Sequence, residues 1–229
     1  MLHRYRTAMV RPGRERLNGD VEADESFFGG VKSGKRGRGA ACKALVAIAV
    51  EQRSPTGYGR ARMQVIPDAT SITLREFLLA NVELGAVVIS DSLRCYPAAC
   101  GEDYRHKPFT LLASGPAHVQ LPGAHRVASL AKRWLLGTHQ GAVEADHLQA
   151  YLNEFCFRFN RRHSRARGLL FYRLMQLAVS APPLTYRHLV VNPQPKRRRP
   201  TAPLGTRSQP ESLALPPAGR PWRQVALLE

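Results

Sequence analysis

Short apolar runs separated by turn-forming residues fill the first third of the chain. The runs 21–28, 44–50 and 58–66 have the length of strands, and the last of them alternates apolar and polar positions as a half-buried strand does. Residues 54–57, Ser-Pro-Thr-Gly, lie between the second and third runs and favour a tight turn. We therefore expect three consecutive strands, the last two paired as a hairpin.

A helical period follows these strands. Residues 68–71 offer N-cap side chains for a helix over 72–79, where apolar positions recur every three to four residues. The short apolar run 86–89 suits a strand buried on both faces, and a fifth strand is expected over 104–112, interrupted by Pro108. Strand, hairpin, helix and strand in this order open an RNase H-like sheet, although several other α/β folds begin in the same way.

The second half of the chain has the pattern of amphipathic helices. Apolar residues recur at helical spacing over 125–136, 144–162 and 168–178, and Gly137 is expected to end the first of these helices. From residue 192 onward the chain is rich in Pro, Arg, Gln and Ser, a composition that cannot bury a core and predicts disorder.

Length and composition set the domain organisation. A chain of 229 residues with 44% hydrophobic content can bury one substantial core. We expect a basic linker over residues 1–18, one α/β domain over residues 19–190 and a disordered Pro/Arg-rich tail over residues 191–229.

Charge points to the class of partner. The 34 Lys and Arg residues exceed the 17 Asp and Glu residues, and the resulting formal charge of +17 favours a polyanion, most often nucleic acid. The four cysteines form no C-x-x-C pair, so a structural zinc site is not expected, and Cys95 and Cys100 are assigned to a loop. No signal peptide or membrane-spanning run is visible, and we expect a cytoplasmic protein associated with the nucleoid and not with a membrane.

Two aspartates lie where apolar strands give way to polar segments. Asp24 follows the start of the first strand and Asp91 closes the run 86–89. Carboxylates from two strands of one sheet can converge on divalent metal ions, and in so cationic a chain the natural substrate of such ions is a phosphodiester. Taken alone, Asp24 is better interpreted as a solvated strand residue and Asp91 as a turn former that starts a loop. The pair predicts DNA-processing chemistry.

Several separated motifs resemble one protein family. They are Val21-Glu22-Ala23-Asp24-Glu25-Ser26 with Gly29-Gly30, Ser90-Asp91 with Tyr96 downstream, and Lys132-Arg133-Trp134-Leu135-Leu136-Gly137-Thr138-His139 followed by residues 152–162. In this order they resemble the catalytic domain of bacterial insertion-sequence transposases of the ISXO-like group, over roughly residues 1–190. The resemblance implies a retroviral-integrase-type, RNase H-like mixed sheet flanked by helices. It also implies a DDE-type site with two Mg²⁺ or Mn²⁺ ions that cleaves DNA strands and transfers them, in a homo-oligomer on element ends and target DNA.

The resemblance also assigns site residues. Asp24 matches the first acid and Asp91 the second, and His125 stands where the family has Glu or, in some groups, Asn. Imidazole is a poorer ligand than carboxylate for Mg²⁺ and suits Mn²⁺ better. His125 is therefore open to four interpretations: a third ligand, a cation that orients water or phosphate, a sign of lost activity, or an ordinary helix residue facing solvent. Glu22 is expected to be a solvated neighbour or an acid that supports the metal ligands.

Basic side chains supply candidate DNA contacts. Lys132 lies two helical turns after His125, on the same face, where a phosphate would be near the metal ions. Other cations lie in a Gly-rich loop and at the end of the long helix, where they are either contacts to the DNA backbone or a solvated surface. The full set is Lys32, Lys35, Arg36, Arg38, Lys132, Arg133, Arg158, Arg161, Arg162 and Arg165.

Transposases of this group also have an upstream zinc ribbon and helical DNA-binding region. The chain is expected to start in the linker after that region, as a truncated or remnant copy. Two alternatives to the active transposase are therefore an inert remnant that binds DNA non-specifically and a basic structural nucleic-acid-binding protein.

Overall fold

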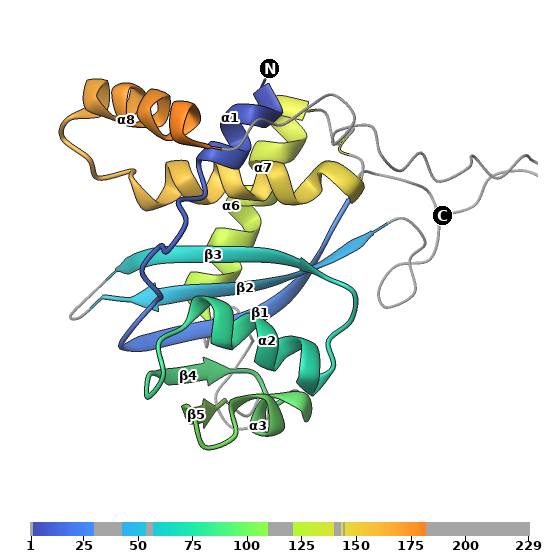
Figure 1. The fold of residues 1–229 in the computed structure, drawn as a ribbon. Coiled ribbons are helices and arrows are strands. Elements are labelled where there is room, and N and C mark those ends of the chain that lie inside the picture. The colour runs from blue at the N-terminus through green and yellow to red at the C-terminus, as the bar shows by residue number, and fades with distance from the viewer. Residues whose placement is uncertain are drawn as a thin grey trace, which may run out of the picture. The chain divides into compact units, whose positions relative to one another are not determined.

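The computed structural model describes residues 2–29, 43–53, 57–109, 121–139, 143 and 145–181. All of them belong to one structural unit, residues 1–189. The tail over residues 191–229, which is expected to be disordered, lies outside the described residues. The elements are α1 (Leu2–Ala8), β1 (Asp20–Phe28), β2 (Ala44–Gln52), β3 (Tyr58–Ile66), α2 (Ser71–Asn81), β4 (Val87–Ser90), α3 (Cys95–Cys100), β5 (Arg105–Pro108), α6 (Pro122–His139), α7 (Ala145–Asn160) and α8 (Arg167–Ser180) (Figure 1).

The strands form one mixed five-stranded sheet in the order β3-β2-β1-β4-β5. Strands β1, β2 and β3 pair as an antiparallel meander, whereas β4 and β5 run parallel to β1. The crossover from β3 through α2 places β4 next to β1, on the side of β1 opposite to β2. This arrangement confirms the predicted α/β, RNase H-like mixed sheet flanked by helices.

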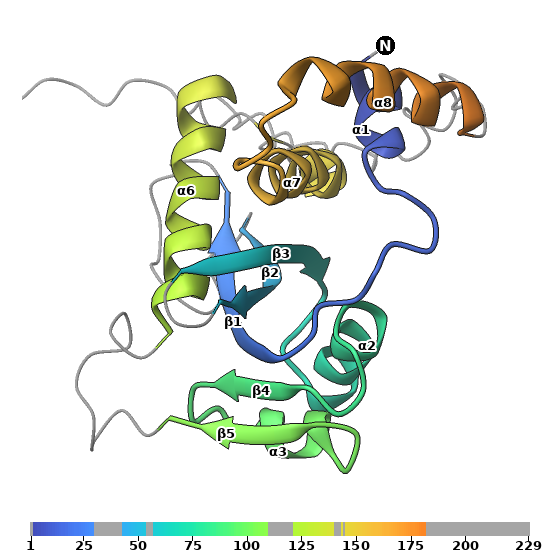
Figure 2. The same cartoon turned by 90° about the vertical axis from the view of Figure 1, so that its left-hand side faces the viewer.

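Helices cover both faces of the sheet, as Figures 1 and 2 show. Alternate residues of each strand divide between two cores, because successive side chains point to opposite faces. Val21 and Ala23 of β1 pack in the core that includes α2 and α3. Phe28 of β1 and Ile48 of β2 pack in the core that includes α6 and α7. Even-numbered residues of β1 therefore face α6.

Helix α7 closes the outer edge of the sheet. Asn160 accepts a hydrogen bond from the Ala61 N–H (2.7 Å) and donates to the Ala61 carbonyl (3.1 Å). Gln149 accepts from the Val65 N–H (2.8 Å) and donates to the Met63 carbonyl (3.2 Å). These two amides take the place of a further strand and leave less of the β3 edge free to pair with another chain.

Two predictions about local structure are wrong. The loop assigned to Cys95 and Cys100 is the short helix α3, because Pro97 lies in its first turn, where a missing N–H leaves no helical bond unmade. Helix α6 does not end at Gly137 but continues to His139, whose ring packs against Trp134 (5.3 Å) and Tyr151 (4.4 Å). Within the described ranges, no helix is both long and apolar enough to cross a bilayer.

Candidate active site

Asp24 and Asp91 lie side by side on neighbouring parallel strands. Ala23 of β1 is the register partner of Ser90 of β4, so the two aspartates are the next residues on each strand path. Adjacent strands are about 4.8 Å apart. Both aspartates line one pocket of about 600 Å³ beside the sheet, within the size range of small-ligand sites. The structure thus brings together the two acids that the sequence singled out.

A single backbone N–H holds one oxygen of each carboxylate. Oδ1 of Asp24 accepts from the Glu25 N–H at 2.8 Å, and Oδ1 of Asp91 accepts from the Leu93 N–H at 3.1 Å. The second contact is the local turn that an aspartate often makes with the backbone two residues on. These contacts orient the carboxylates without neutralising them.

Burial makes the ionisation of the Asp24 carboxyl unfavourable. Only 13% of its side chain is exposed, and burial, the largest influence, raises the pKa of Asp24 above its ordinary value. The charge of Asp91 raises it further, while His125, the Glu25 N–H and Lys132 lower it without cancelling the rise. A cation bound between two such carboxylates would relieve both the desolvation and the repulsion.

His125 lies next to this pair, in the first turns of α6. Its Nε2 is 3.9 Å from Oδ2 of Asp24, and 39% of its side chain is exposed. This distance allows an ion pair but exceeds a direct hydrogen bond. In the described part of the chain, no three His, Cys, Asp or Glu side chains are arranged to hold a metal ion. Within the described residues, the carboxylate pair therefore has His125 at its margin and no third carboxylate placed to share a metal ion with it.

Glu22 is buried, and the expectation that it is solvated is wrong. Its side chain is 0% exposed: Oε2 accepts from the Ala124 N–H (2.8 Å) and Oε1 from Nε2 of Gln52 (2.8 Å). The physical reason is that the start of α6 packs directly on β1, where a carboxylate satisfies a free helical N–H and complements the helix dipole. Glu22 therefore anchors the helix turn that carries His125.

Gly123 makes this close approach possible. A Cβ atom at Gly123 would lie 2.9 Å from Oε2 of Glu22 and 2.7 Å from the Tyr58 ring, closer than real Cβ contacts come. A side chain here would force Tyr58, Glu22 or α6 itself to shift. The glycine therefore helps to set the distance between His125 and Asp24.

Lys132 brings a cation to the same face of β1. Its Nζ donates to Oγ of Ser26 at 2.6 Å and lies 5.2 Å from the centre of the Phe28 ring. Burial lowers the pKa of Lys132, and the charge of Lys43 lowers it further, while Asp24 raises it. Lys132 therefore interacts with Asp24 of the carboxylate pair. Lys132 and Arg133, next in sequence, are both exposed.

Two residues that border the pair were given no role by sequence reasoning. Tyr96 of α3 is buried, and burial, with the nearby charges of Glu25, Asp24 and Asp91, raises its pKa well above 10.0. Its phenol therefore stays neutral beside the acids. Lys43 lines the same pocket as the two aspartates. Only the place of Tyr96 in the family motif pointed to it, and nothing in the sequence pattern pointed to Lys43.

The predicted DNA contacts are divided. Lys32, Lys35, Arg36 and Arg38 lie outside the described residues. Arg158 is exposed on α7, 3.6 Å from Glu154 and 5.9 Å from the centre of the Trp134 ring, and Arg165 is exposed beyond the helix. Arg158 and Arg165 are therefore available to a ligand at the surface.

Arg161 and Arg162 contact the protein itself. Arg162 donates to the backbone carbonyls of Tyr58 and Gly59, the latter at 3.2 Å, and lies 4.0 Å from the centre of the Phe159 ring. Arg161 lies 3.9 Å from the centre of the Phe157 ring. Arg162 therefore ties the end of α7 to β3, a structural role that the sequence pattern did not indicate.

Comparison with protein families gives one match. The model of the ISXO2-like transposase domain matches residues 16–160, well over half of the chain, and this range contains Asp24, Asp91 and His125. No curated protein matched the sequence. The chain therefore belongs to the ISXO2-like transposase domain family, and it is a DNA-binding domain that acts in DNA transposition.

Proposed function

We propose that this domain cleaves DNA strands and transfers them to target DNA in a reaction that depends on divalent metal ions held by Asp24 and Asp91. The observation that carries the proposal is that Asp24, in the middle of β1, and Asp91, directly after the parallel strand β4, line one pocket of about 600 Å³. The raised pKa of Asp24 supports it, because perturbed acids in a pocket mark sites built for a ligand.

The donor set suits Mg²⁺ or Mn²⁺. Both ions prefer carboxylate oxygens, and Oδ2 of Asp24 is not used by the backbone contact that holds Oδ1. Bound by Asp24 and Asp91, two such ions would supply activation of the attacking oxygen and stabilisation of the leaving oxygen in an in-line displacement. The family match supports this chemistry.

Three further residues have roles in the proposal. Glu22 holds the start of α6 against β1 and so places His125 beside Asp24. His125 contacts the metal site or the scissile phosphate from the margin of the pair. Lys132, now bonded to Ser26, offers a positive charge to a phosphate on the same face. We expect the active species to be a homo-oligomer, since strand transfer acts on two element ends.

A plasmid-nicking assay tests the carboxylate pair. The substrate is a supercoiled plasmid carrying the genomic segments that flank the gene, incubated with Mg²⁺ or Mn²⁺. Asp24→Asn and Asp91→Asn should each abolish cleavage. Asp20→Asn, an exposed acid at the start of the same strand, should cleave like the parent. Cleavage that survives either site substitution would refute the assignment.

A second candidate function is an inert DNA-binding remnant. It is favoured by the imidazole of His125 at a position where the family resemblance calls for Glu or Asn. Comparing His125→Glu with His125→Ala decides between the two candidates. If His125 completes the site, Glu should raise Mg²⁺-dependent cleavage and Ala should lower it. An inert parent together with an inert His125→Glu variant would leave only the remnant.

A further inference from the structure

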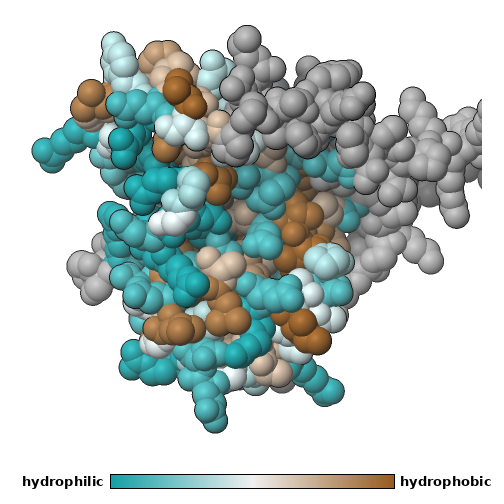
Figure 3. Space-filling model, in the orientation of Figure 1, coloured by the Kyte–Doolittle hydropathy of each residue, from teal (hydrophilic) through white to brown (hydrophobic). Residues whose placement is uncertain are grey.

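Five arginines line a second pocket, of about 280 Å³, beside the edge strand β3 of the sheet. The segment after α1, strand β3 and helix α7 enclose it, and Glu15, Asn153 and Asn160 also line it. In the view of Figure 3, hydrophilic residues gather over this part of the surface. The arginines are Arg11, Arg14, Arg60, Arg62 and Arg161.

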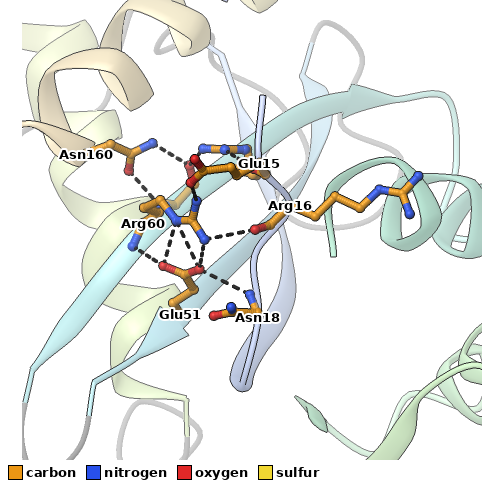
Figure 4. Close-up of polar contacts among 8 residues, drawn as sticks. Glu15, Arg16, Asn18, Glu51, Arg60 and Asn160 are labelled. Carbon is orange, nitrogen blue, oxygen red and sulfur yellow. Dashed lines mark hydrogen bonds and ion pairs between the residues drawn. The ribbon is translucent and has the colours of Figure 1, made fainter. Parts of the chain in front are cut away.

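Arg60 is the arginine of this set that carboxylates neutralise (Figure 4). Its guanidinium donates to both oxygens of Glu51, the shortest contact being 2.6 Å, and to Oε2 of Glu15 at 2.9 Å. It also donates to the Arg16 carbonyl at 2.8 Å. This network fixes the segment after α1 against β3. In it, both Glu15 and Glu51 are paired with Arg60.

Among the described residues, Arg14, Arg62 and Arg161 donate only to neutral acceptors. Arg62, 6% exposed, donates to the carbonyls of Ala61 (3.2 Å) and Glu15 (2.9 Å), while its Nε finds no acceptor within the described residues. Arg14 donates to Oδ1 of Asn81 at 2.9 Å. Arg161 donates to a carbonyl one helical turn back.

No ion pair joins any of these three arginines, or Arg11, to a carboxylate elsewhere in the described chain.

Positive charges gathered this closely repel one another. Burial, with a smaller contribution from the charge of Arg14, lowers the pKa of Arg62 to about 10. Burial also lowers the pKa of Arg14 and of Arg161. Guanidinium groups taken from water without a counter-charge cost free energy that a bound anion offsets. The planar fork of arginine matches the oxygens of a phosphate in particular.

We propose that this arginine pocket binds a phosphate group, at a site separate from the aspartate pair. The two pockets share no lining residue, and β3 lies two strands from β1 in the sheet. A volume of about 280 Å³ is just below the usual range for drug-sized ligands, which suits a single phosphate better than a whole nucleotide. The phosphate belongs either to the backbone of bound DNA or to the free inorganic anion.

Thermal unfolding with inorganic phosphate tests the pocket directly. The full chain is heated in phosphate or in chloride at equal ionic strength, and phosphate should raise the melting temperature of the parent. The rise should be lost in Arg14→Gln and in the double variant Arg11→Gln/Arg14→Gln. Arg105→Gln, an exposed arginine on β5 at the other edge of the sheet, should keep the rise. Arg11 is exposed, so Arg11→Gln alone keeps the test valid if Arg14→Gln unfolds.

Binding of random duplex DNA separates the two sources of phosphate. If the pocket takes a DNA phosphate, the log–log slope of affinity against salt should fall by about 0.9 for each phosphate that the arginine variants no longer neutralise, and it should stay unchanged in Arg105→Gln. A phosphate-dependent melting shift with an unchanged DNA slope assigns the pocket to the free anion. Variants that match the parent in both measurements overturn the proposal. Asp24→Asn should retain both responses, so a failure of the catalytic proposal is distinguishable.

Discussion

Two carboxylates buried in neighbouring strands of this sheet have opposite surroundings. Glu51 of β2 accepts from the N–H groups of Asn18 (3.1 Å) and Arg60 (2.8 Å) and from the Arg60 guanidinium. Burial alone would raise the pKa of Glu51, but the contacts with Arg60 lower it below its ordinary value. Asp24 of β1 has one backbone N–H, a histidine at 3.9 Å and a second aspartate beside it, and its pKa is raised.

The different surroundings of Glu51 and Asp24 suit a structural role for the first and a ligand-binding role for the second. The hydrogen bonds of Glu51 are complete, so its charge stabilises the fold and leaves nothing for a ligand. Ionisation of Asp24 costs free energy that its contacts with His125, Lys132 and the Glu25 N–H offset only in part. A carboxylate in such surroundings is typical of a site that binds a cation. Glu22 is of the first kind, since both of its oxygens are bonded, yet it serves the site by anchoring α6.

The largest expected effect is on catalysis. Asp91→Asn removes a proposed metal ligand and a charge that raises the pKa of Asp24. Cleavage should therefore fall by about 10³-fold or more, because metal coordination contributes several kcal/mol to the transition state. Single-turnover cleavage rates measure the loss. The same substitution should lower the titration midpoint of the Asp24 carboxyl, observed by NMR. An unchanged midpoint would mean that the two carboxylates do not interact.

Next in size is the loss of Glu51. Glu51→Gln removes the less exposed of the two carboxylates that pair with Arg60 and should lower the free energy of unfolding by about 2–4 kcal/mol at neutral pH. Because the folded pKa of Glu51 is lowered, its contribution is present above the ordinary value of 4.5 and is lost as pH falls through the folded value. Denaturant unfolding at pH 7 and at pH 3 should therefore show the deficit shrinking in acid. A deficit independent of pH would contradict this account of the pair.

Glu22 should give a smaller, graded effect. Glu22→Gln keeps an oxygen for the Ala124 N–H and should cost about 1 kcal/mol of unfolding free energy, whereas Glu22→Ala leaves that N–H unpaired and should cost about 2–3 kcal/mol. If Glu22 positions His125, cleavage by the folded Ala variant should fall while cleavage by the Gln variant is largely kept. Equal cleavage by both variants would reduce Glu22 to a purely structural residue.

The smallest effect is a gain in stability at Asp24. Because its folded pKa is raised, ionisation of Asp24 destabilises the fold as pH rises through that value. Asp24→Asn should therefore melt at a higher temperature than the parent at pH 7, and the difference should shrink as pH falls below the ordinary value of 3.8, where Asp24 becomes protonated in both the folded and the unfolded state. Differential scanning calorimetry across this range measures it. A variant less stable than the parent at pH 7 would contradict the comparison with Glu51.

The sequence predicted most of the fold because its strands carry their own signals. The strand expected over 58–66 is β3, and the parallel pairing of β1 with β4 follows from the crossover between them. Helix α3 was missed, since six residues with an internal proline give no period to detect. Helix α6 was predicted too short, because a glycine near its end is outweighed by the aromatic contacts of His139.

The candidate site was predicted in part. Asp91 directly follows β4, as the sequence pattern predicts, whereas Asp24 lies in the middle of β1, which continues to Phe28. Glu22 was placed on the correct face of β1, but its burial depends on α6, which lies 102 residues away in the sequence. The arginine pocket combines three distant segments, and no local pattern predicts such a meeting.

The central claim is that Asp24 and Asp91 together bind a divalent ion. Titration with Mn²⁺, with the free ion counted by electron paramagnetic resonance, tests it without requiring DNA or turnover. The parent and Asp20→Asn should bind Mn²⁺ with the same affinity, whereas Asp24→Asn and Asp91→Asn should each weaken binding by at least about tenfold. Equal Mn²⁺ binding by the parent and the Asp24→Asn/Asp91→Asn double variant would contradict the claim.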